Sequence, residues 1–395
     1  MASLLQLLLH LSEKAANLAR RIRAEKTLFD LLVEEKTGEQ KNKNFVHDFK
    51  TLADVLIQEL IRHEVSKQHP SLADHVLGEE SNKFTNTLGE TIVVAVQDTE
   101  QQTCSLLTKV LDGNAEAAAI LASIIHREVA MTTDELLATV QIDLDVDSVG
   151  IWIDPIDGTS EYIHGGGEGP LPADGICPVG LPLALVLIGV FDRATGQPLM
   201  GLINQPFAKY NKQDNSWAGQ SLWGISYKNT NINNIETPKS DAADKKGMSV
   251  VMSRSEVPQF ISAMEMITNN NVKYTGGAGY KVYCAIQQLV DAYVLSKGST
   301  FKWDTCAPHS ILKSLGGGII DLAKGLSGMK ESPEGSYGEA ELQSTQLAYN
   351  QPDDVKGASP GQKWANAGGM IAYRKPEVAL KILSELCVIK GSEEG

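Results

Sequence analysis

Carboxylates that follow apolar segments are the residues of this 395-residue chain whose types and spacing could do chemistry. The clearest group is the hexapeptide DPIDGT that begins at Asp154, directly after an apolar run. Asp154 and Asp157 lie three residues apart across a proline-stiffened turn, so both can face one cavity, with the carbonyl of Ile156 turned inward between them. The backbone N–H groups of Gly158 and Thr159 then suit an anion at the start of the next element.

Taken alone, this hexapeptide is equally consistent with an ordinary strand-to-turn junction. Three other segments favour function, because each also places a carboxylate at the boundary of an expected element. Glu79 and Glu80 end a short strand, Asp54 lies in the first turn of a helix, and Asp304 is expected at the N-cap of another helix. Carboxylates gathered without His or Cys select a hard cation with oxygen ligands, which favours Mg²⁺ over Zn²⁺.

Composition excludes several other classes of function. Lys and Arg number 35 against 49 Asp and Glu, for a formal charge of −14, so neither a nucleic-acid polymer nor an anionic membrane is an expected partner. Five scattered cysteines without a CxxC pair argue against a disulfide framework, and no apolar run is long enough to span a membrane. We therefore expect a cytosolic protein. His309 and Cys306 lie near Asp304, but the thiol has no evident base and we expect both to be structural.

Layered α/β architecture is expected around these carboxylates. Helical periodicity covers 4–22, a capping box starts a helix at Thr51, and 98–145 is expected to be mostly helical. Apolar strands are expected at 149–154, 183–191, 199–204 and 221–227.

The chain divides into an N-terminal half (1–228) with Asp54, Glu79 and the DPIDGT segment, a linker (229–247) and a C-terminal half (248–395) with Asp304 and Lys281. In the C-terminal half, strands and helices are expected to alternate at 248–253, 256–268, 280–290, 291–296, 305–315 and 317–322, followed by a long surface loop at 323–362.

Five segments together resemble one protein family. They are GEES at 78–81, WIDPIDGTSEY at 152–162, INQP at 203–206, GGAG at 276–279 and WDTCAPHSIL at 303–312. These resemble the magnesium-dependent, lithium-sensitive phosphomonoesterases of the inositol monophosphatase and fructose-1,6-bisphosphatase superfamily. Longer segments at 34–59, 78–90, 195–207, 300–322 and 363–374 are most similar to the branch that removes the 1-phosphate of inositol polyphosphates. The resemblance implies an alternating α/β/α/β/α sandwich.

The resemblance also implies how metal ions are held. Glu79, Asp154 and the carbonyl of Ile156 would bind a first Mg²⁺, and Asp154, Asp157 and Asp304 a second. A third, weaker Mg²⁺ would lie near Glu79, and Li⁺ would inhibit. Glu80 would either support these ligands or be an exposed neighbour of Glu79.

Catalytic and substrate roles follow from the same resemblance. Asp54 and Thr159 would orient and deprotonate a water for in-line attack on phosphorus. Gly158 and Thr159 would position the phosphate, and Ala278 and Lys281 match family positions around the inositol ring and its distal phosphate. Candidates for the same pocket are Ser299 and Thr300. Lys281 could instead be a solvated helix lysine.

Two positions depart from the family pattern and leave the identity of the substrate undecided. Gly158 stands where the 1-phosphatase branch tends to carry Ser, and Lys297 where relatives often place an acidic residue. Inositol 1,4-bisphosphate and inositol 1,3,4-trisphosphate are the expected substrates, and a 3′(2′),5′-bisphosphate nucleotidase acting on adenosine 3′,5′-bisphosphate is the alternative. An inactive scaffold that binds Mg²⁺ or inositol phosphates is a third reading, and a monomer is expected.

Overall fold

A computed structural model describes residues 3–25, 33–35, 49–86, 88–130, 136–137, 140–236, 247–333, 336–353 and 360–393. The N-terminal half contains α1 (Leu4–Ala24), β1 (Val33–Glu35), β2 (Phe49–Thr51), α3 (Leu52–Gln68), β3 (Val76–Gly78), β4 (Lys83–Thr85), β5 (Thr91–Val93), α4 (Glu100–Val110), α5 (Ala115–His126), β6 (Val149–Asp157), α7 (Thr159–His164), β7 (Leu185–Asp192), β8 (Pro198–Asn211), β9 (Ser216–Tyr227) and β10 (Thr230–Asn233).

The C-terminal half contains β11 (Val250–Met252), α8 (Pro258–Thr268), β12 (Val272–Tyr274), α9 (Ala278–Ile286), β13 (Ala292–Leu295), α10 (Lys302–Ser314), β14 (Gly318–Asp321), α11 (Leu322–Glu331), α12 (Glu339–Ser344), β15 (Met370–Tyr373) and α13 (Pro376–Glu393). Short 3₁₀ turns lie at Pro70–His75, Val146–Ser148, Leu181–Leu183 and Pro360–Gln362. Every helix among the described residues is too short or too polar to span a membrane.

The larger sheet has the order β10-β9-β8-β7-β6-β3 and is antiparallel except for the parallel β3–β6 pair. Alternate side chains of a strand point to opposite faces of a sheet, and both faces of this sheet are covered by a hydrophobic core. On β7, Val186 and Ile188 face the core beneath α1 and α3, whereas Leu185 and Leu187 face the core shared with α9 and α10. The near-continuous apolar run of this strand is thereby explained.

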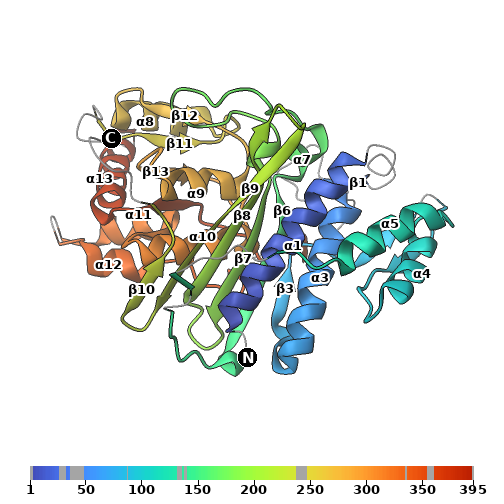
Figure 1. Cartoon of the computed structure of the whole chain (residues 1–395). Helices are drawn as coiled ribbons and strands as arrows, with labels where there is room; N and C mark the ends of the chain where they lie inside the picture. Colours follow the sequence, from blue (N-terminus) through green and yellow to red (C-terminus); the bar gives the residue numbers. More distant parts are fainter. Residues whose placement is uncertain are drawn as a thin grey trace.

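The second sheet has the order β12-β11-β13-β15-β14, with β11, β12 and β13 parallel. Val251 and Tyr293 face the core with α9 and α10, while Val250 and Val294 face the core with α8, α11 and α13. The layers therefore run α/β/α/β/α, with α9 and α10 between the sheets (Figure 1). This confirms the expected fold class.

A row of glycines lets α10 lie directly on the larger sheet. Gly189, Gly201 and Gly224 are register partners on β7, β8 and β9. A Cβ at Gly189 would lie 2.5 Å from the backbone nitrogen of Ala307, and one at Gly201 would overlap the carbonyl oxygen of Ala307. The absence of side chains along this row sets the distance between α10 and the sheet.

The local predictions for the N-terminal half are largely confirmed. Thr51 caps α3 in a capping box with Asp54, and α1 packs by its Leu-rich stripe. Within 98–145, α4 and α5 are helical, but 127–130 and 140–145 are not. The strands β8 and β9 extend well beyond the predicted ranges.

Two segments that were expected to be linker or loop contain regular secondary structure. Within the expected linker, β10 pairs with β9, so the larger sheet continues past residue 228 to Asn233; residues 237–246 lie outside the described residues. The expected loop at 323–362 contains α11 and α12. Leu326 of α11 is buried, and a Cβ at Gly325 would lie 3.1 Å from Leu383 of α13. Gly325, one of the small residues that suggested a loop, therefore lies where α11 packs against α13.

Candidate active site

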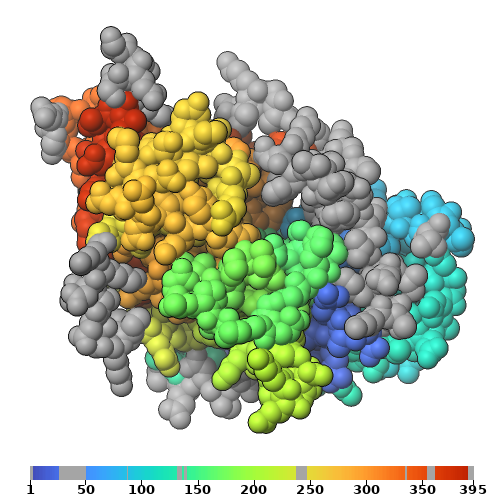
Figure 2. All heavy atoms as spheres, turned by 90° about the horizontal axis from the view of Figure 1, so that it is seen from above, coloured from blue at the N-terminus to red at the C-terminus, as the bar shows by residue number. Residues whose placement is uncertain are grey.

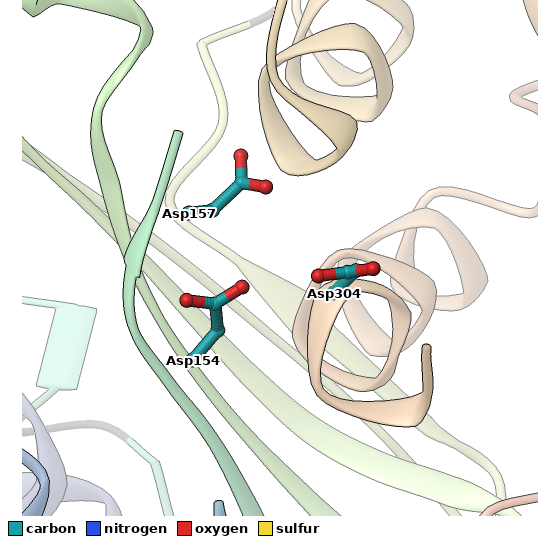
Figure 3. A group of neighbouring side chains, drawn as sticks. All are labelled: Asp154, Asp157 and Asp304. Carbon is teal, nitrogen blue, oxygen red and sulfur yellow. The ribbon is translucent and has the colours of Figure 1, made fainter. Parts of the chain in front are cut away.

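A β-bulge makes Asp154 and Asp157 face the same side of the larger sheet. Residues three apart on a regular strand point to opposite faces. Here Asp154 pairs with Leu187 and Asp157 with Leu185, so three steps on β6 match two on β7. The extra residue rotates Asp157 onto the face of Asp154. Both carboxylates point into one space (Figure 3), an arrangement that sequence analysis attributed to a turn.

Asp304 reaches the same space from α10. It lies at the third position of the helix and not at the N-cap, which is Phe301; the predicted start at residue 305 was therefore too late. Its Oδ2 accepts a hydrogen bond of 2.7 Å from the Phe301 backbone N–H. One ligand atom each of Asp154, Asp157 and Asp304 lies within 4.8 Å of the others, and all three side chains are buried (Figure 3).

The parallel pair β3–β6 positions Glu79 and Glu80. Gly78 is the register partner of Ile153, and the Glu79 N–H donates to the Ile153 carbonyl at 3.1 Å. The carboxyl ends of both strands thus meet at one edge, as expected of a parallel pair. Glu80 is buried, with its N–H and carbonyl both bonded to the Gln58 carboxamide. Burial of Glu80 contradicts its reading as an exposed neighbour.

Asp54 is held by the capping box that starts α3. Its Oδ2 accepts from the backbone N–H of Thr51 at 2.7 Å and from the Thr51 hydroxyl at 2.6 Å. The other oxygen, Oδ1, faces the Thr159 hydroxyl at 3.4 Å, and that hydroxyl also lies 3.0 Å from the Ile156 carbonyl. The structure therefore brings Asp54, Thr159 and Ile156 together from two separate segments.

The electrostatics of the carboxylate cluster disfavour its ionised, empty form. Burial raises the pKa of Asp154 and of Asp304 well above the usual range, and the neighbouring carboxylates raise it further. Burial likewise raises the pKa of Asp157 to about 6; the Lys281 ammonium opposes this shift, whereas the Glu79 charge adds to it. A cation placed among these groups would reverse the penalty.

The cluster fits a hard cation. Asp154 Oδ1 and Asp157 Oδ2 are buried oxygens without a hydrogen-bond partner among the described residues. Unsatisfied buried carboxylate oxygens are costly unless a cation or donor meets them. The three grouped side chains offer only oxygen, the donor that Mg²⁺ prefers over softer metals. The donor set, the spacing and the free oxygens therefore agree with a magnesium site.

The expected substrate residues adjoin this cluster. Gly158 has φ +83 and directly precedes α7, which begins at Thr159. The Ala278 N–H, at the start of α9, donates to Asp157 Oδ1 at 3.2 Å. Lys281 is 5 % exposed, and its ammonium donates to the Gly277 carbonyl at 2.6 Å, so the solvated-lysine alternative is wrong.

Burial lowers the pKa of Lys281 to about 8, although the carboxylates nearby oppose that shift. Thr300 is also buried, and its hydroxyl and carbonyl accept hydrogen bonds from Asn366. Ser299 is less buried than Thr300 and precedes α10.

Sequence analysis missed the segment that holds the start of α10. The Asn366 carboxamide donates to the Phe301 carbonyl at 3.0 Å and to the Thr305 hydroxyl at 3.2 Å. The Lys302 ammonium, 1 % exposed, pairs with Asp353 at 2.9 Å. Lysines and asparagines carry no signal of such burial in a single sequence. The glycines of the row on β7, β8 and β9 were visible, but their register was not.

The two residues near Asp304 that were expected to be structural are buried. His309 lies between the Tyr349 hydroxyl at 2.9 Å and Gln346 Oε1 at 2.6 Å. Burial raises the pKa of the Cys306 thiol well above its usual value. Both side chains are therefore part of the core, and the expectation of a buried, hydrogen-bonded His309 is confirmed.

Comparison with known proteins agrees with this site and fold. The inositol monophosphatase family model matches residues 7–355. Inositol polyphosphate 1-phosphatase of Mus musculus is 45% identical over 397 residues, covering 98% of this chain and 97% of that protein. A 3′(2′),5′-bisphosphate nucleotidase 1 of Rattus norvegicus is 30% identical over 173 residues, covering 44% of this chain and 49% of that protein.

Among solved structures, the extragenic suppressor protein suhB of Bartonella henselae matches with a TM-score of 0.50 and 13% identity, covering 97% of this chain and 98% of that chain. That similarity supports the fold alone. Family match, sequence identity and fold agree along nearly the whole chain, and the chain therefore belongs to the inositol monophosphatase family.

Proposed function

We propose that this protein is a Mg²⁺-dependent, Li⁺-inhibited phosphomonoesterase that hydrolyses the 1-phosphate of inositol 1,4-bisphosphate and of inositol 1,3,4-trisphosphate. The observation that carries the proposal is the convergence of Asp154, Asp157 and Asp304 beside the Asp54–Thr159 pair. The 45% identity to a 1-phosphatase over almost the entire length supports the choice of substrate.

The proposed reaction forms a bond between phosphorus and a water oxygen and breaks the bond between phosphorus and the ring oxygen, which takes up a proton from solvent and leaves as a hydroxyl group. Asp54 accepts the proton of the attacking water through the Thr159 hydroxyl. Asp54 Oδ1 faces the Thr159 hydroxyl, so it is the oxygen that would take up this proton. When Thr159 donates to Asp54, its own lone pairs can orient the water toward phosphorus.

Glu79, Asp154, Asp157, Asp304 and the Ile156 carbonyl would hold two Mg²⁺ ions, with Asp154 shared between them, and a third ion would lie near Glu79. Bound there, these ions would supply Lewis-acid activation and neutralise phosphoryl charge. The backbone N–H groups of Gly158 and Thr159 would position the phosphate, and Ala278, Lys281, Ser299 and Thr300 would lie on the side of the ring. Glu80 would support these metal ligands.

A 3′(2′),5′-bisphosphate nucleotidase is the second candidate, because such a protein matches this chain at 30% identity. That match covers less than half of either chain. An inactive scaffold is the third, but Asp54 and Thr159 are both present and face each other. We therefore rank the 1-phosphatase first, and propose that it acts as a cytosolic monomer without nucleic-acid or membrane partners.

Phosphate release from three substrates separates these candidates. Inositol 1,4-bisphosphate, inositol 1-phosphate and adenosine 3′,5′-bisphosphate are each incubated with the protein and Mg²⁺, with and without Li⁺. The fastest turnover is expected with inositol 1,4-bisphosphate, and Li⁺ should suppress it. Faster turnover of the nucleotide would reverse the order of the two enzymes, and no turnover of any substrate would leave only the scaffold.

A further inference from the structure

The helix that carries Asp304 is enclosed between the two halves of the chain. It packs against β7 and β8 of the larger sheet and against β14 of the second sheet. In Figure 2 the green surface of the N-terminal half adjoins the yellow surface of the C-terminal half. Packing on both sides fixes where α10 lies, and the hydrogen bonds of its first turn fix where the Asp304 carboxylate points.

Phe301 is the residue that directs this carboxylate. It is the N-cap of α10, and its N–H donates to Asp304 Oδ2 at 2.7 Å. An N-cap Ser, Thr, Asp or Asn normally accepts a hydrogen bond from the first turn, which a Phe side chain cannot do. The first turn therefore needs partners from elsewhere in the chain, and the Lys302 N–H accordingly donates to the Trp364 carbonyl at 3.0 Å.

The Asn366 carboxamide holds the other peptide group of Phe301. Its Nδ2 donates to the Phe301 carbonyl at 3.0 Å, and it lies 3.2 Å from the Thr300 hydroxyl and 3.2 Å from the Thr305 hydroxyl. The Thr305 hydroxyl itself donates to the same carbonyl at 3.0 Å. Phe301 is thus fixed on both sides, by Asp304 at its N–H and by Asn366 and Thr305 at its carbonyl.

The hydrogen bonds of Asn366 are one-sided. The side chain is 0 % exposed, and its Oδ1 is buried without a hydrogen-bond partner among the described residues. A buried oxygen without a partner lowers stability, and its presence calls for an explanation. The explanation is the NH₂ group on the same carboxamide, which no apolar residue of similar size could supply.

Other contacts keep the start of α10 attached when this carboxamide is removed. The Asn366 backbone N–H donates to the Thr300 carbonyl at 2.8 Å, and the Lys302 ammonium pairs with Asp353 at 2.9 Å. Asp353 also accepts from the Ala367 N–H at 3.1 Å. Loss of the carboxamide should therefore leave the fold in place and free the Phe301 carbonyl from one of its two donors.

We propose that Asn366 is a positioning residue for the metal ligand Asp304. By holding the Phe301 carbonyl together with Thr305, it keeps the Phe301 N–H on Asp304 Oδ2 and the carboxylate turned toward the other two aspartates. The proposal rests on the proposed function, because it takes the three carboxylates to bind Mg²⁺. Residues that orient a metal ligand typically contribute roughly 10–100-fold to metal affinity, and Asn366 acts at one further remove, so the expected contribution is about tenfold.

Asn204 offers a matched control for the loss of a buried asparagine. Its side chain is also 0 % exposed, and its Oδ1 likewise has no partner among the described residues. Its Nδ2 donates to Glu13 at 3.0 Å and to Ser221 at 2.9 Å, on α1 and β9. Asn204→Ala therefore removes a comparable set of hydrogen bonds without touching the first turn of α10.

Calorimetric titration with Mg²⁺ compares Asn366→Ala and Asn204→Ala with the parent. Both variants should lower Tm by a similar amount in thermal unfolding. The Mg²⁺ affinity should fall about tenfold in Asn366→Ala and stay within about twofold in Asn204→Ala. The Mg²⁺ concentration that gives half-maximal phosphate release should rise in parallel in Asn366→Ala, whereas the KM for inositol 1,4-bisphosphate at saturating Mg²⁺ should stay close to that of the parent.

Parental Mg²⁺ affinity in Asn366→Ala, or an equal loss in Asn204→Ala, overturns the positioning role. If Asn366→Ala does not fold, Thr305→Val decides, because it removes the second donor to the Phe301 carbonyl at nearly the same volume. Parental Mg²⁺ affinity in Thr305→Val then overturns the proposal, and a weakened affinity that Thr305→Ser restores supports it.

The same titration separates this inference from the proposed function. A parent that binds Mg²⁺ but turns over no inositol phosphate refutes the proposed function, and the Mg²⁺ affinities of the variants then still decide the role of Asn366. A parent that binds no Mg²⁺ overturns both.

Discussion

Gly189→Ala tests whether the glycine row positions Asp304. The new Cβ would lie 2.5 Å from the Ala307 nitrogen and 2.7 Å from the Cys306 carbonyl carbon. An ordinary carbon contact needs about 3.5 Å, so α10 and β7 must separate by roughly 1 Å. Both atoms belong to the backbone of α10, and rotation of a side chain cannot relieve the overlap.

Asp304 lies within one turn of Ala307 on the same helix and must move with it. A misplacement of about 1 Å can cost roughly 100-fold in activity. We therefore expect a loss of about 100-fold in kcat and a clear weakening of Mg²⁺ binding. Overpacking should also lower the free energy of unfolding by about 1–3 kcal/mol.

The assay combines calorimetric Mg²⁺ titration, phosphate release and thermal unfolding. Gly169→Ala is the matched control, since its Cβ would meet no atom within 4 Å. Gly224→Ala is a milder variant of the same row. Its new Cβ would lie 2.6 Å from the Ser314 hydroxyl, at the end of α10 remote from Asp304, so we expect a smaller loss of activity and Mg²⁺ affinity. Parental Mg²⁺ affinity and activity in Gly189→Ala would refute the positioning role of the row.

Three further predictions concern other parts of the molecule. Asp54→Asn should lower kcat by about 10²–10⁴-fold because the base is lost, while its carboxamide oxygen can still accept from Thr51 and calorimetric Mg²⁺ affinity changes little; near-parental turnover would contradict the proton transfer. Asp353→Ala should destabilise by about 3–5 kcal/mol in thermal unfolding, because the buried Lys302 ammonium loses its ion pair, and Lys302→Met in the same chain should recover most of that loss. Burial, followed by the Lys313 charge, lowers the pKa of His309 to about 3, so the unfolded chain binds a proton below the ordinary pKa and the folded chain does not. The free energy of unfolding should therefore fall by about 2 kcal/mol as the pH is lowered from 7 to 5 because of this residue. In urea unfolding, His309→Gln should lack that part of the pH dependence.

The sequence was sufficient to predict a structural feature where all of the interacting residues lie within one segment. The capping box of Thr51 and Asp54 was predictable, because both members lie within one turn of helix. The same was true of the apolar strand predicted at 149–154, which the structure extends to Asp157. Local signals failed at α11, where Gly325 packs against Leu383 and low periodicity suggested a loop. Tertiary packing there outweighs the low helix propensity of glycine.

The sequence by itself determined the kind of chemistry. Carboxylates without His or Cys at element boundaries indicate a hard-cation site, and these residue types do not depend on the fold. Resemblance over nearly the whole chain then indicated the family.

Only the tertiary structure decided how these groups meet. The bulge in β6 places Asp157 on the face of Asp154, and the glycine row seats α10 so that Asp304 completes the group. Register between strands distant in sequence is a global property, because each pairing depends on all the others.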